Sequence, residues 1–202
     1  MLRCLAGEWT STRSAIETSG DGGKSLRTNS KDITLTAVFA AMYVVINVLQ
    51  MFTVGNPTIY GPIQLRVADC LITLAALLGL PVIGGVTLGC FVTNLFYFLG
   101  IQDVIFGPVA NLVAAVIIFK LRKHVFVGSV LGATSIGLIV GIYLSTVFGF
   151  QPAMITAILP AWLAMIVSMV ISSLITLVGI GLPLLLALSR AYPTKSKDLV
   201  QI

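Results

Sequence analysis

Two carboxylates, Asp69 and Asp103, and one guanidinium, Arg66, have the clearest chemical potential, because the sequence around them is almost free of charge. Arg66 and Asp69 are three residues apart, so a helix would place them on one face, where they can form an ion pair. A carboxylate accepts hydrogen bonds from N–H donors, which makes both acids candidates for binding a polar heterocycle. Arg66 is explained equally well as a structural partner of Asp69 that closes a loop onto the protein.

Amide and hydroxyl side chains accompany these charges. Carboxamides both donate and accept, so they can complete the edge of a bound ring. Asn94 and Asn111 are explained equally well by hydrogen bonds between helices. Asp103 has a second explanation as the N-cap of a helix, where its oxygen would bond free backbone N–H groups. The candidate binding set is Tyr60, Gln64, Arg66, Asp69, Asn94, Gln102, Asp103 and Asn111.

The sequence contains no pattern typical of a catalytic or metal centre. A GxxxxGK[ST] phosphate loop and an HExxH pair are both absent. The single histidine, His124, lies among cations, so the apolar region has no Ser–His pair. Cys4, Cys70 and Cys90 are scattered and form no CxxC pair. We therefore expect no catalytic residue, no metal site and no cofactor.

The composition predicts that lipid surrounds the elements that hold these residues. Of 202 residues, 57% are hydrophobic and 9% charged, against roughly 45–50% and 25% in ordinary soluble domains. The net charge of +5 comes from cations at the chain ends and in one cluster, which is typical of anchors of membrane helices rather than of a nucleic-acid surface. From Ile33 to Ser189 only six residues are charged: Arg66, Asp69, Asp103, Lys120, Arg122 and Lys123.

An all-α, polytopic membrane protein with six transmembrane helices fits this region, because a crossing needs about 20 apolar residues and Pro, Gly and charges mark the breaks. Residues 1–32 are read as a disordered cytoplasmic tail, 33–189 as the membrane domain and 190–202 as a second cytoplasmic tail. The last segment exceeds one crossing, so it is expected to tilt, to kink at Pro160 or to extend beyond the membrane. The spans are expected at about 33–54, 65–80, 81–100, 103–121, 125–148 and 152–188.

The distribution of Lys and Arg predicts the orientation in the cell membrane, because cytoplasmic loops collect these residues. Basic clusters precede the first span and follow the fourth and the sixth, and an even number of crossings separates them. Both termini are therefore predicted to be cytoplasmic. The loop at 55–64, Arg66, Asp69 and Asp103 then lie on the outer side, where an aromatic belt is the favoured explanation of Tyr60 over a role in stacking on a ligand.

Small residues recur at a spacing of four, which lets helix backbones approach closely. Gly85 with Gly89 on the third span is best explained by packing inside the bundle. The pair Ala37 and Ala41 on the first span fits either internal packing or an external docking surface. The fifth span has two such pairs, Gly128 with Gly132 and Gly137 with Gly141, and internal packing is the favoured explanation there too.

Four segments between Ile33 and Ala115 resemble a known family, the membrane-embedded S components of energy-coupling factor (ECF) transporters, and within it the queuosine-precursor (QueT) group. They are ITLTAVFAAMYVVINVL, YGPIQLRVADCLITL, GGVTLGCFVTNLF and QDVIFGPVANLVAA, and the order of GPIQLR, LGCFVTNL and DVIFG makes the resemblance specific. The last two spans match only in hydropathy and length. Where the family motif has Ser-Glu-Ala after its arginine, this chain has Ala68, Asp69 and Cys70, so its acid is one methylene shorter.

The resemblance implies a six-helix subunit that captures a deazapurine precursor of queuosine at the outer face. It also implies delivery of that ligand by a module of one transmembrane coupling protein and two ATPases. In S components an AxxxA motif on the first helix docks onto the coupling protein, and here it falls on Ala37 and Ala41. A guanine-like ring would present adjacent N–H donors to Asp69 or Asp103, and an aminomethyl cation would use the other acid.

Four other hypotheses remain open at this point. A stand-alone channel or facilitator would be favoured if the glycines of the fifth span mediated homo-oligomers. An S component for a different vitamin-like substrate would keep the architecture and change the ligand. A scaffold protein without a small-molecule site predicts that Asp69 and Asp103 are dispensable, and an intramembrane enzyme ranks last.

Overall fold

The computed structural model of the chain describes residues 30–54, 65–147 and 160–191, and every regular element in these ranges is a helix. Six helical segments follow one another, which confirms the all-α membrane fold. Four of them are long and apolar enough to cross a membrane, and the segments 67–78 and 80–96 are shorter. The elements are α2 (Ser30–Val54), η1 (Val67–Leu74), α4 (Ala75–Leu78), α5 (Leu80–Phe96), α6 (Ile101–Lys120), α7 (Val125–Val147), α8 (Ala161–Leu174), η2 (Ile175–Gly181) and α9 (Leu182–Ala191).

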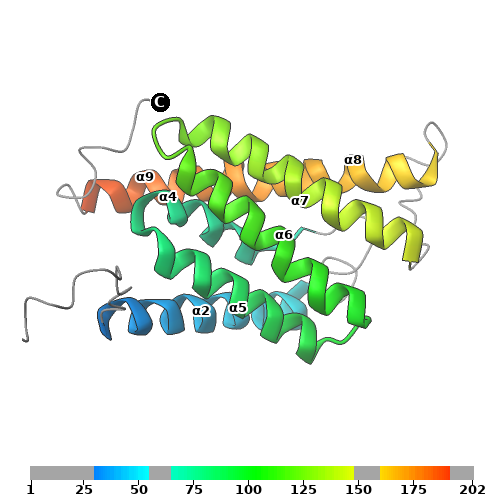
Figure 1. Ribbon diagram of the computed structural model, residues 1–202, viewed down its shortest axis with the longest axis horizontal. Coiled ribbons are helices and arrows are strands. Elements are labelled where there is room, and N and C mark those ends of the chain that lie inside the picture. The colour runs from blue at the N-terminus through cyan, green and yellow to red at the C-terminus, as the bar shows by residue number, and fades with distance from the viewer. Residues whose placement is uncertain (1–29, 55–64, 148–159, 192–202) are drawn as a thin grey trace, which may run out of the picture.

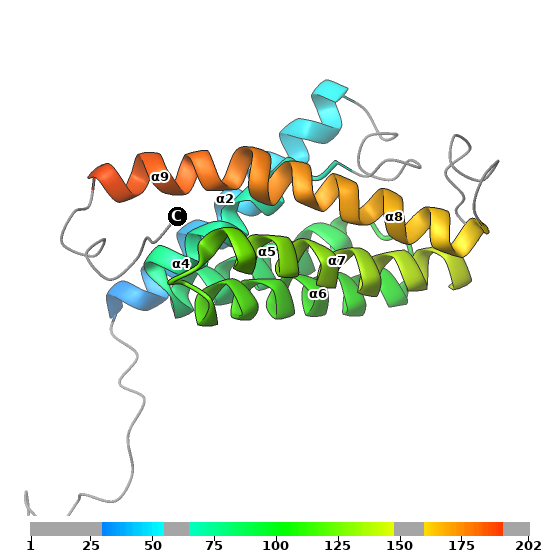
Figure 2. The same cartoon turned by 90° about the horizontal axis from the view of Figure 1, so that it is seen from above.

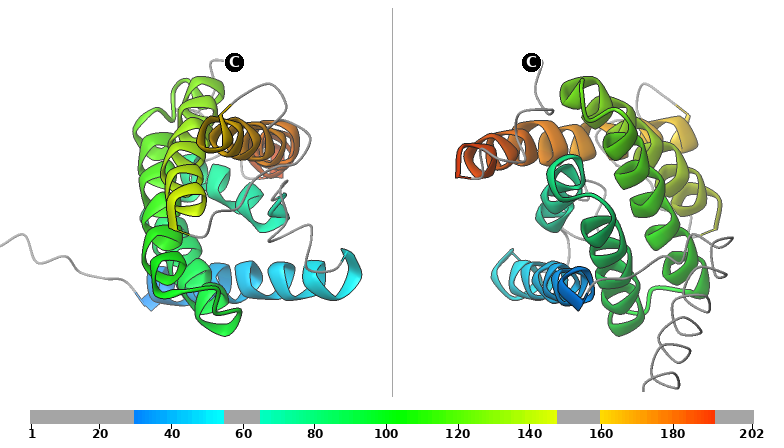
Figure 3. Two further views of the ribbon diagram at one scale, coloured as in Figure 1. Left: turned by 90° about the vertical axis from the view of Figure 1, so that its right-hand side faces the viewer. Right: turned by 60° about the vertical axis from the view of Figure 1, so that its left-hand side comes forward.

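The long helices form a curved wall around the second segment. Helices α5, α6 and α7 lie side by side, α2 packs against α5, and α8 packs against α7 (Figures 1 and 3). Between the two ends of this wall lies η1, which contacts α2, α5 and α6 on one side and η2 on the other. Side chains of α2, α5, α6 and η2 can therefore reach η1.

Glycines allow the closest of these helix contacts. A Cβ on Gly85 of α5 would lie 2.6 Å from the Phe39 Cβ of α2, and one on Gly89 would lie 2.7 Å from the Tyr43 Cβ. A Cβ on Gly137 of α7 would lie 2.8 Å from the Val170 backbone nitrogen of α8. The glycines of the third and fifth predicted spans therefore pack inside the bundle, as expected, and the oligomer interface suggested for the fifth span loses its basis.

The second segment is shorter and less regular than the helix predicted at 65–80. Arg66 has an extended backbone (φ −92°, ψ 98°), a 3₁₀ helix follows from Val67, and α4 ends at Leu78. Gly79 then turns the chain with φ +73°, a conformation that a side chain would strain. Residues 68–77 are all buried, so protein rather than lipid surrounds this half-length segment.

The last segment does not kink at Pro160, which is the N-cap of α8. Its irregularity lies further along, where η2 is a π-helix between α8 and α9. Pro183 follows two residues after η2 and has no N–H to donate, which accounts for a disturbed helical ladder at this point. The segment continues as one long helical rod across the bundle (Figure 2).

The basic residues of the described helix ends gather at one end of the bundle. The start of α2, the turn between α6 and α7 and the end of α9 all lie on the left in Figure 1. Lys31, Arg122, Lys123 and Arg190 belong to these segments. The clustering agrees with the distribution on which the predicted orientation depends, and the orientation itself stays a prediction.

Candidate functional site

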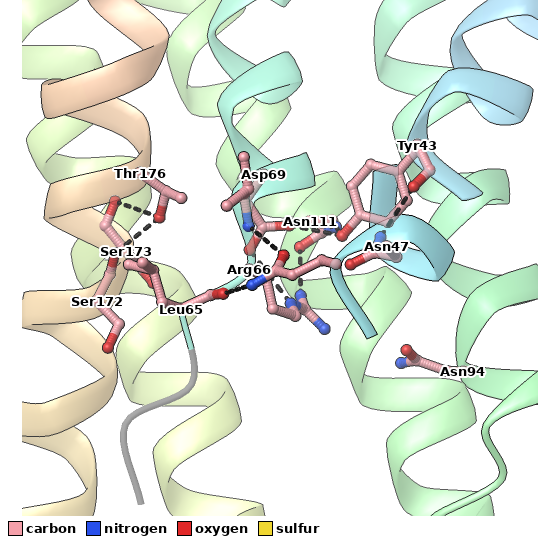
Figure 4. A network of polar contacts seen from close by, with 12 residues as sticks. Tyr43, Asn47, Leu65, Arg66, Asp69, Asn94, Asn111, Ser172, Ser173 and Thr176 are labelled. Atoms are coloured by element: carbon pink, nitrogen blue, oxygen red, sulfur yellow. Dashed lines mark hydrogen bonds and ion pairs between the residues drawn. The ribbon is translucent and has the colours of Figure 1, made fainter. Parts of the chain in front are cut away.

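A buried polar network joins α2, η1 and α6 at the centre of the bundle (Figure 4). The Tyr43 hydroxyl donates to Asp69 Oδ1 at 2.5 Å and accepts from Asn111 Nδ2 at 2.8 Å. Asn111 Nδ2 also lies 3.5 Å from Asp69 Oδ1. Each of the three side chains is at most 3% exposed, so the hydrogen bonds replace water that has no access.

Arg66 completes this network and neutralises its charge. Its Nε lies 3.3 Å from Asp69 Oδ2, which confirms the ion pair predicted from their spacing. Its Nη2 donates to Asn111 Oδ1 at 3.3 Å, so both ends of the Asn111 amide are used. Both carboxylate oxygens of Asp69 thus have partners from within the chain, and the network carries no net charge.

The network lies deeper than the sequence suggested. Arg66 and Asp69 were expected near the outer surface, at the start of a full crossing. They instead contact Tyr43 and Asn111, which lie near the midpoints of α2 and α6. The reason is that the second segment is only half a crossing long, so its first residues start near the middle of the bundle.

Gln50 of α2 satisfies the irregular backbone where η1 begins. Its Nε2 donates to the Leu65 carbonyl, and its Oε1 accepts from the Val67 N–H at 3.0 Å. An extended backbone in the hydrocarbon region is tolerated only when protein or water satisfies its polar groups. The two bonds from one buried amide therefore allow the chain to start a helix at this depth.

Asp103 forms a second polar site at the first turn of α6. The Tyr143 hydroxyl of α7 donates to Asp103 Oδ1 at 2.5 Å, and the Tyr143 ring stacks on Phe106 with centroids 5.8 Å apart. Asn94 Nδ2 of α5 donates to the Asp103 backbone carbonyl at 2.8 Å. Asp103 is 4% exposed, and its Oδ2 has no hydrogen-bond partner among the described residues.

The alternative explanation of Asp103 as a helix N-cap is wrong. Gly100 occupies the N-cap position of α6, and no side chain caps this end. Asp103 lies within the first turn and points to α7 instead, where Tyr143 takes one of its oxygens. Asn94 and Asn111 do form hydrogen bonds between helices, which was one of the two explanations for them.

The two sites share one face of α6. Asp103, Gly107 and Asn111 follow at intervals of four residues, so they lie along one side of the helix over about 12 Å of its length. A Cβ on Gly107 would overlap the Asn94 amide nitrogen, because α5 approaches closely between the two sites. The carboxylates therefore lie along one wall, at different depths, rather than together.

Further polar groups surround the start of η1. In Figure 4, Asn47 of α2 and Asn94 of α5 lie to one side of Arg66 and Ser172 of α8 to the other. Asn47 Oδ1 and Ser172 Oγ are buried and have no hydrogen-bond partner among the described residues. Unsatisfied buried atoms are rare and call for an explanation such as a bound ligand or water. No group of three potential metal-ligating side chains occurs within the described ranges.

The remaining candidates take separate places. Tyr60 and Gln64 lie outside the described residues. Gln102 is half-buried next to Asp103 in the first turn of α6. Ala37 and Ala41 lie on the exposed face of α2, opposite the face that carries Tyr43.

Sequence reasoning missed four residues of these sites. Tyr43, Asn47 and Gln50 lie at positions i, i+4 and i+7 of an otherwise apolar helix, and this polar stripe was a readable signal. Tyr143 is an isolated tyrosine on the fifth segment, and nothing in its spacing indicated that it would meet Asp103.

A helical membrane bundle with ionisable groups buried between its helices is typical of proteins that move polar solutes across a bilayer. Comparison with known protein families identifies one of them: the sequence pattern of the family described as "QueT transporter" matches residues 33–190. The chain therefore belongs to the QueT transporter family, as the resemblance indicated, and the match includes its last two helical segments. Comparisons with curated proteins and with solved structures give no match.

Proposed function

We propose that this membrane transport protein is the substrate-binding S component of an ECF importer. It captures a deazapurine precursor of queuosine at its outer face. A transmembrane coupling protein and two ATPases then deliver the ligand to the cytoplasm, where both termini of the chain lie. Family membership supports the transport role, and the ligand and the partners are the part proposed here.

The observation that carries the proposal is the division of α2 into two faces. One face is buried and carries Tyr43, Asn47 and Gln50 toward the polar centre. The other face exposes Ala37 and Ala41, whose small side chains leave the helix backbone accessible to another helix. A subunit that must hold a solute inside and dock onto a partner outside needs such a helix.

The interior polar atoms favour a ligand rich in N–H donors. Asn47 Oδ1 and Asp103 Oδ2 are both acceptors without partners among the described residues. A guanine-like ring presents adjacent N–H groups, which carboxylate and amide oxygens accept. Binding of such a ring would satisfy atoms that are otherwise costly to bury.

The docking half of the proposal is tested by enlarging the alanines. Ala37→Leu with Ala41→Leu should abolish uptake and retention of the coupling protein, because a larger side chain prevents close helix approach. Ligand binding by the purified subunit, measured by calorimetry, should stay within twofold. The matched control is Val38→Leu with Met42→Leu, two exposed positions at the same spacing on α2. Uptake that persists in the alanine double variant would contradict the docking assignment.

The substrate half is tested by calorimetry on the purified wild-type chain. One deazapurine should bind per chain with roughly nanomolar affinity, and adenine should bind at least 100-fold more weakly. Absence of binding to every queuosine precursor would remove the substrate from the proposal while leaving the docking test valid.

A further inference from the structure

The two carboxylates of the bundle differ in what surrounds them. Asp69 has an ion pair with Arg66 and hydrogen bonds that occupy both of its oxygens. Asp103 has one hydrogen bond to its carboxylate, from Tyr143, and its second oxygen has no partner among the described residues. Both side chains are at least nine-tenths buried, so solvent explains neither state.

The charge of Asp103 is also unmatched. Within the described ranges the only ion pair is that between Arg66 and Asp69, so no cation of this part of the chain lies within 4.0 Å of Asp103. A buried carboxylate without a counter-charge is strongly unfavourable. A positive charge or hydrogen-bond donors from outside the described side chains would satisfy this oxygen.

A second buried oxygen, on Asn47, is also a hydrogen-bond acceptor without a partner among the described residues. Helices α2 and α5 run parallel, and Gly89 packs against Tyr43, so Asn47 and Asn94 lie at a similar depth one turn further out. Asn94 holds the Asp103 backbone, and Asn47 Oδ1 is a second acceptor without a partner among the described residues. Asp103 Oδ2 and Asn47 Oδ1 thus both accept hydrogen bonds, and they favour a cationic donor over an anion.

We propose that Asp103 is the subsite for an ammonium group of the transported molecule, whereas Asp69 only holds the bundle together. The identity of the ring rests on the proposed function, and the charge preference does not. The hydrogen bond from Tyr143 holds one oxygen of Asp103 in place, and the second oxygen accepts a hydrogen bond from the ammonium group. The chain therefore prefers a deazapurine that carries a primary ammonium to a neutral one of similar size.

The test compares two probes on the purified wild-type chain by calorimetry: 7-aminomethyl-7-deazaguanine, which is cationic, and 7-cyano-7-deazaguanine, which is neutral. A hydrogen bond to a charged group contributes roughly 10- to 100-fold in affinity. We expect the cationic base to bind at least 10-fold more tightly. Equal affinities, or tighter binding of the neutral base, would overturn the ammonium subsite.

The variant Asp103→Asn tests whether this residue causes the preference for the cationic base. Asp103→Asn should remove the preference, lowering affinity for the cationic base at least 10-fold and changing that for the neutral base less than threefold. An unchanged preference would overturn the assignment. The control is Ser129→Ala, because the Ser129 hydroxyl is also buried and without a partner among the described residues. Ser129 lies near the opposite end of α7 from Tyr143, so its loss should change neither affinity.

The outcomes separate the two levels of the proposal. If the wild-type chain binds neither base, the deazapurine substrate of the proposed function fails. The same pair of proteins, wild type and Asp103→Asn, is then compared with putrescine and with butanol, and a loss of putrescine binding in the variant would still support the ammonium subsite. If both bases bind and Asp103→Asn affects them equally or not at all, the ammonium subsite fails and the substrate class stands. If Asp103→Asn does not fold, the wild-type comparison of the two bases decides.

Discussion

The Asp69 network and the Asp103 site each contain a buried carboxylate. They differ in how many of its oxygens have a hydrogen-bond partner among the described residues. At Asp69, side chains of the same chain give both carboxylate oxygens a partner, and the charges of Arg66 and Asp69 cancel. At Asp103, the chain supplies a hydroxyl and a positioned backbone but leaves one oxygen open. If Asp103 binds the ammonium group as proposed, a buried charge in this bundle has a binding role only where its partners within the chain are incomplete.

The largest effect is expected from breaking the closed network. Arg66→Met leaves the Asp69 carboxylate buried without its cation, which should lower the free energy of unfolding by about 3–5 kcal/mol. Unfolding of the purified protein in mixed detergent micelles measures this loss. The double variant Arg66→Met/Asp69→Leu should regain part of it, because no unpaired charge remains. A double variant no more stable than the single one would contradict the reading of this pair as a mutually dependent unit.

The next effect concerns the backbone that brings Asp69 to mid-depth. Gln50→Leu leaves the Leu65 carbonyl and the Val67 N–H without their partner, which should cost about 2–3 kcal/mol of unfolding free energy. The same micelle assay applies. Thr53→Val is the control, since it also replaces a polar side chain of α2 by an apolar one, but the Thr53 hydroxyl bonds only to carbonyls of its own helix, so its loss should be smaller. Equal losses in the two variants would show that the two Gln50 hydrogen bonds contribute nothing of their own.

A third change acts between the two sites. Gly107→Ala places a Cβ against the Asn94 amide, which should cost about 2 kcal/mol of stability and displace Asn94 from the Asp103 carbonyl. Ligand affinity should fall along with stability. Gly179→Ala is the control, because no atom beyond its chain neighbours and its own helix backbone lies within 4 Å of that new Cβ among the described residues. A Gly107→Ala protein as stable as the control would refute the close contact between α5 and α6.

The smallest effect should distinguish the two tyrosines. Tyr43→Phe removes two hydrogen bonds of the closed network and should lower the unfolding free energy by about 2 kcal/mol with little change in ligand affinity. Tyr143→Phe should cost about 1 kcal/mol and mainly weaken ligand binding, because it frees the Asp103 carboxylate to move. Thermal unfolding and calorimetry on both variants measure the change in stability and in ligand affinity for each. A larger loss of affinity in Tyr43→Phe than in Tyr143→Phe would exchange the roles assigned to the two sites.

Much of the fold could be predicted from the sequence because its signals are local. Apolar length, Pro and Gly breaks and the small-residue spacing placed six segments near their observed bounds, and the Arg66–Asp69 pair followed from a spacing of three. The depth of that pair could not be predicted. It depends on how far a half-length helix enters the bundle, and this is set by Gln50, Gly79 and the packing of η1 against η2.

The candidate site was predictable only in part for the same reason. Arg66, Asp69, Asn94, Asp103 and Asn111 were found because charged and amide side chains are rare in apolar helices. Their distribution into two sites depends in part on contacts between residues far apart in the sequence, such as Tyr143 with Asp103 and Tyr43 with Asn111. No spacing rule within one segment encodes such contacts.

A crystal structure with 7-aminomethyl-7-deazaguanine bound would show which carboxylate contacts the ammonium group. We expect the ammonium nitrogen within hydrogen-bond distance of Asp103 Oδ2, with Asp69 still bonded to Arg66, Tyr43 and Asn111. A base whose ammonium group displaces Arg66 from Asp69, with Asp103 bonded to Tyr143 alone, would contradict this expectation.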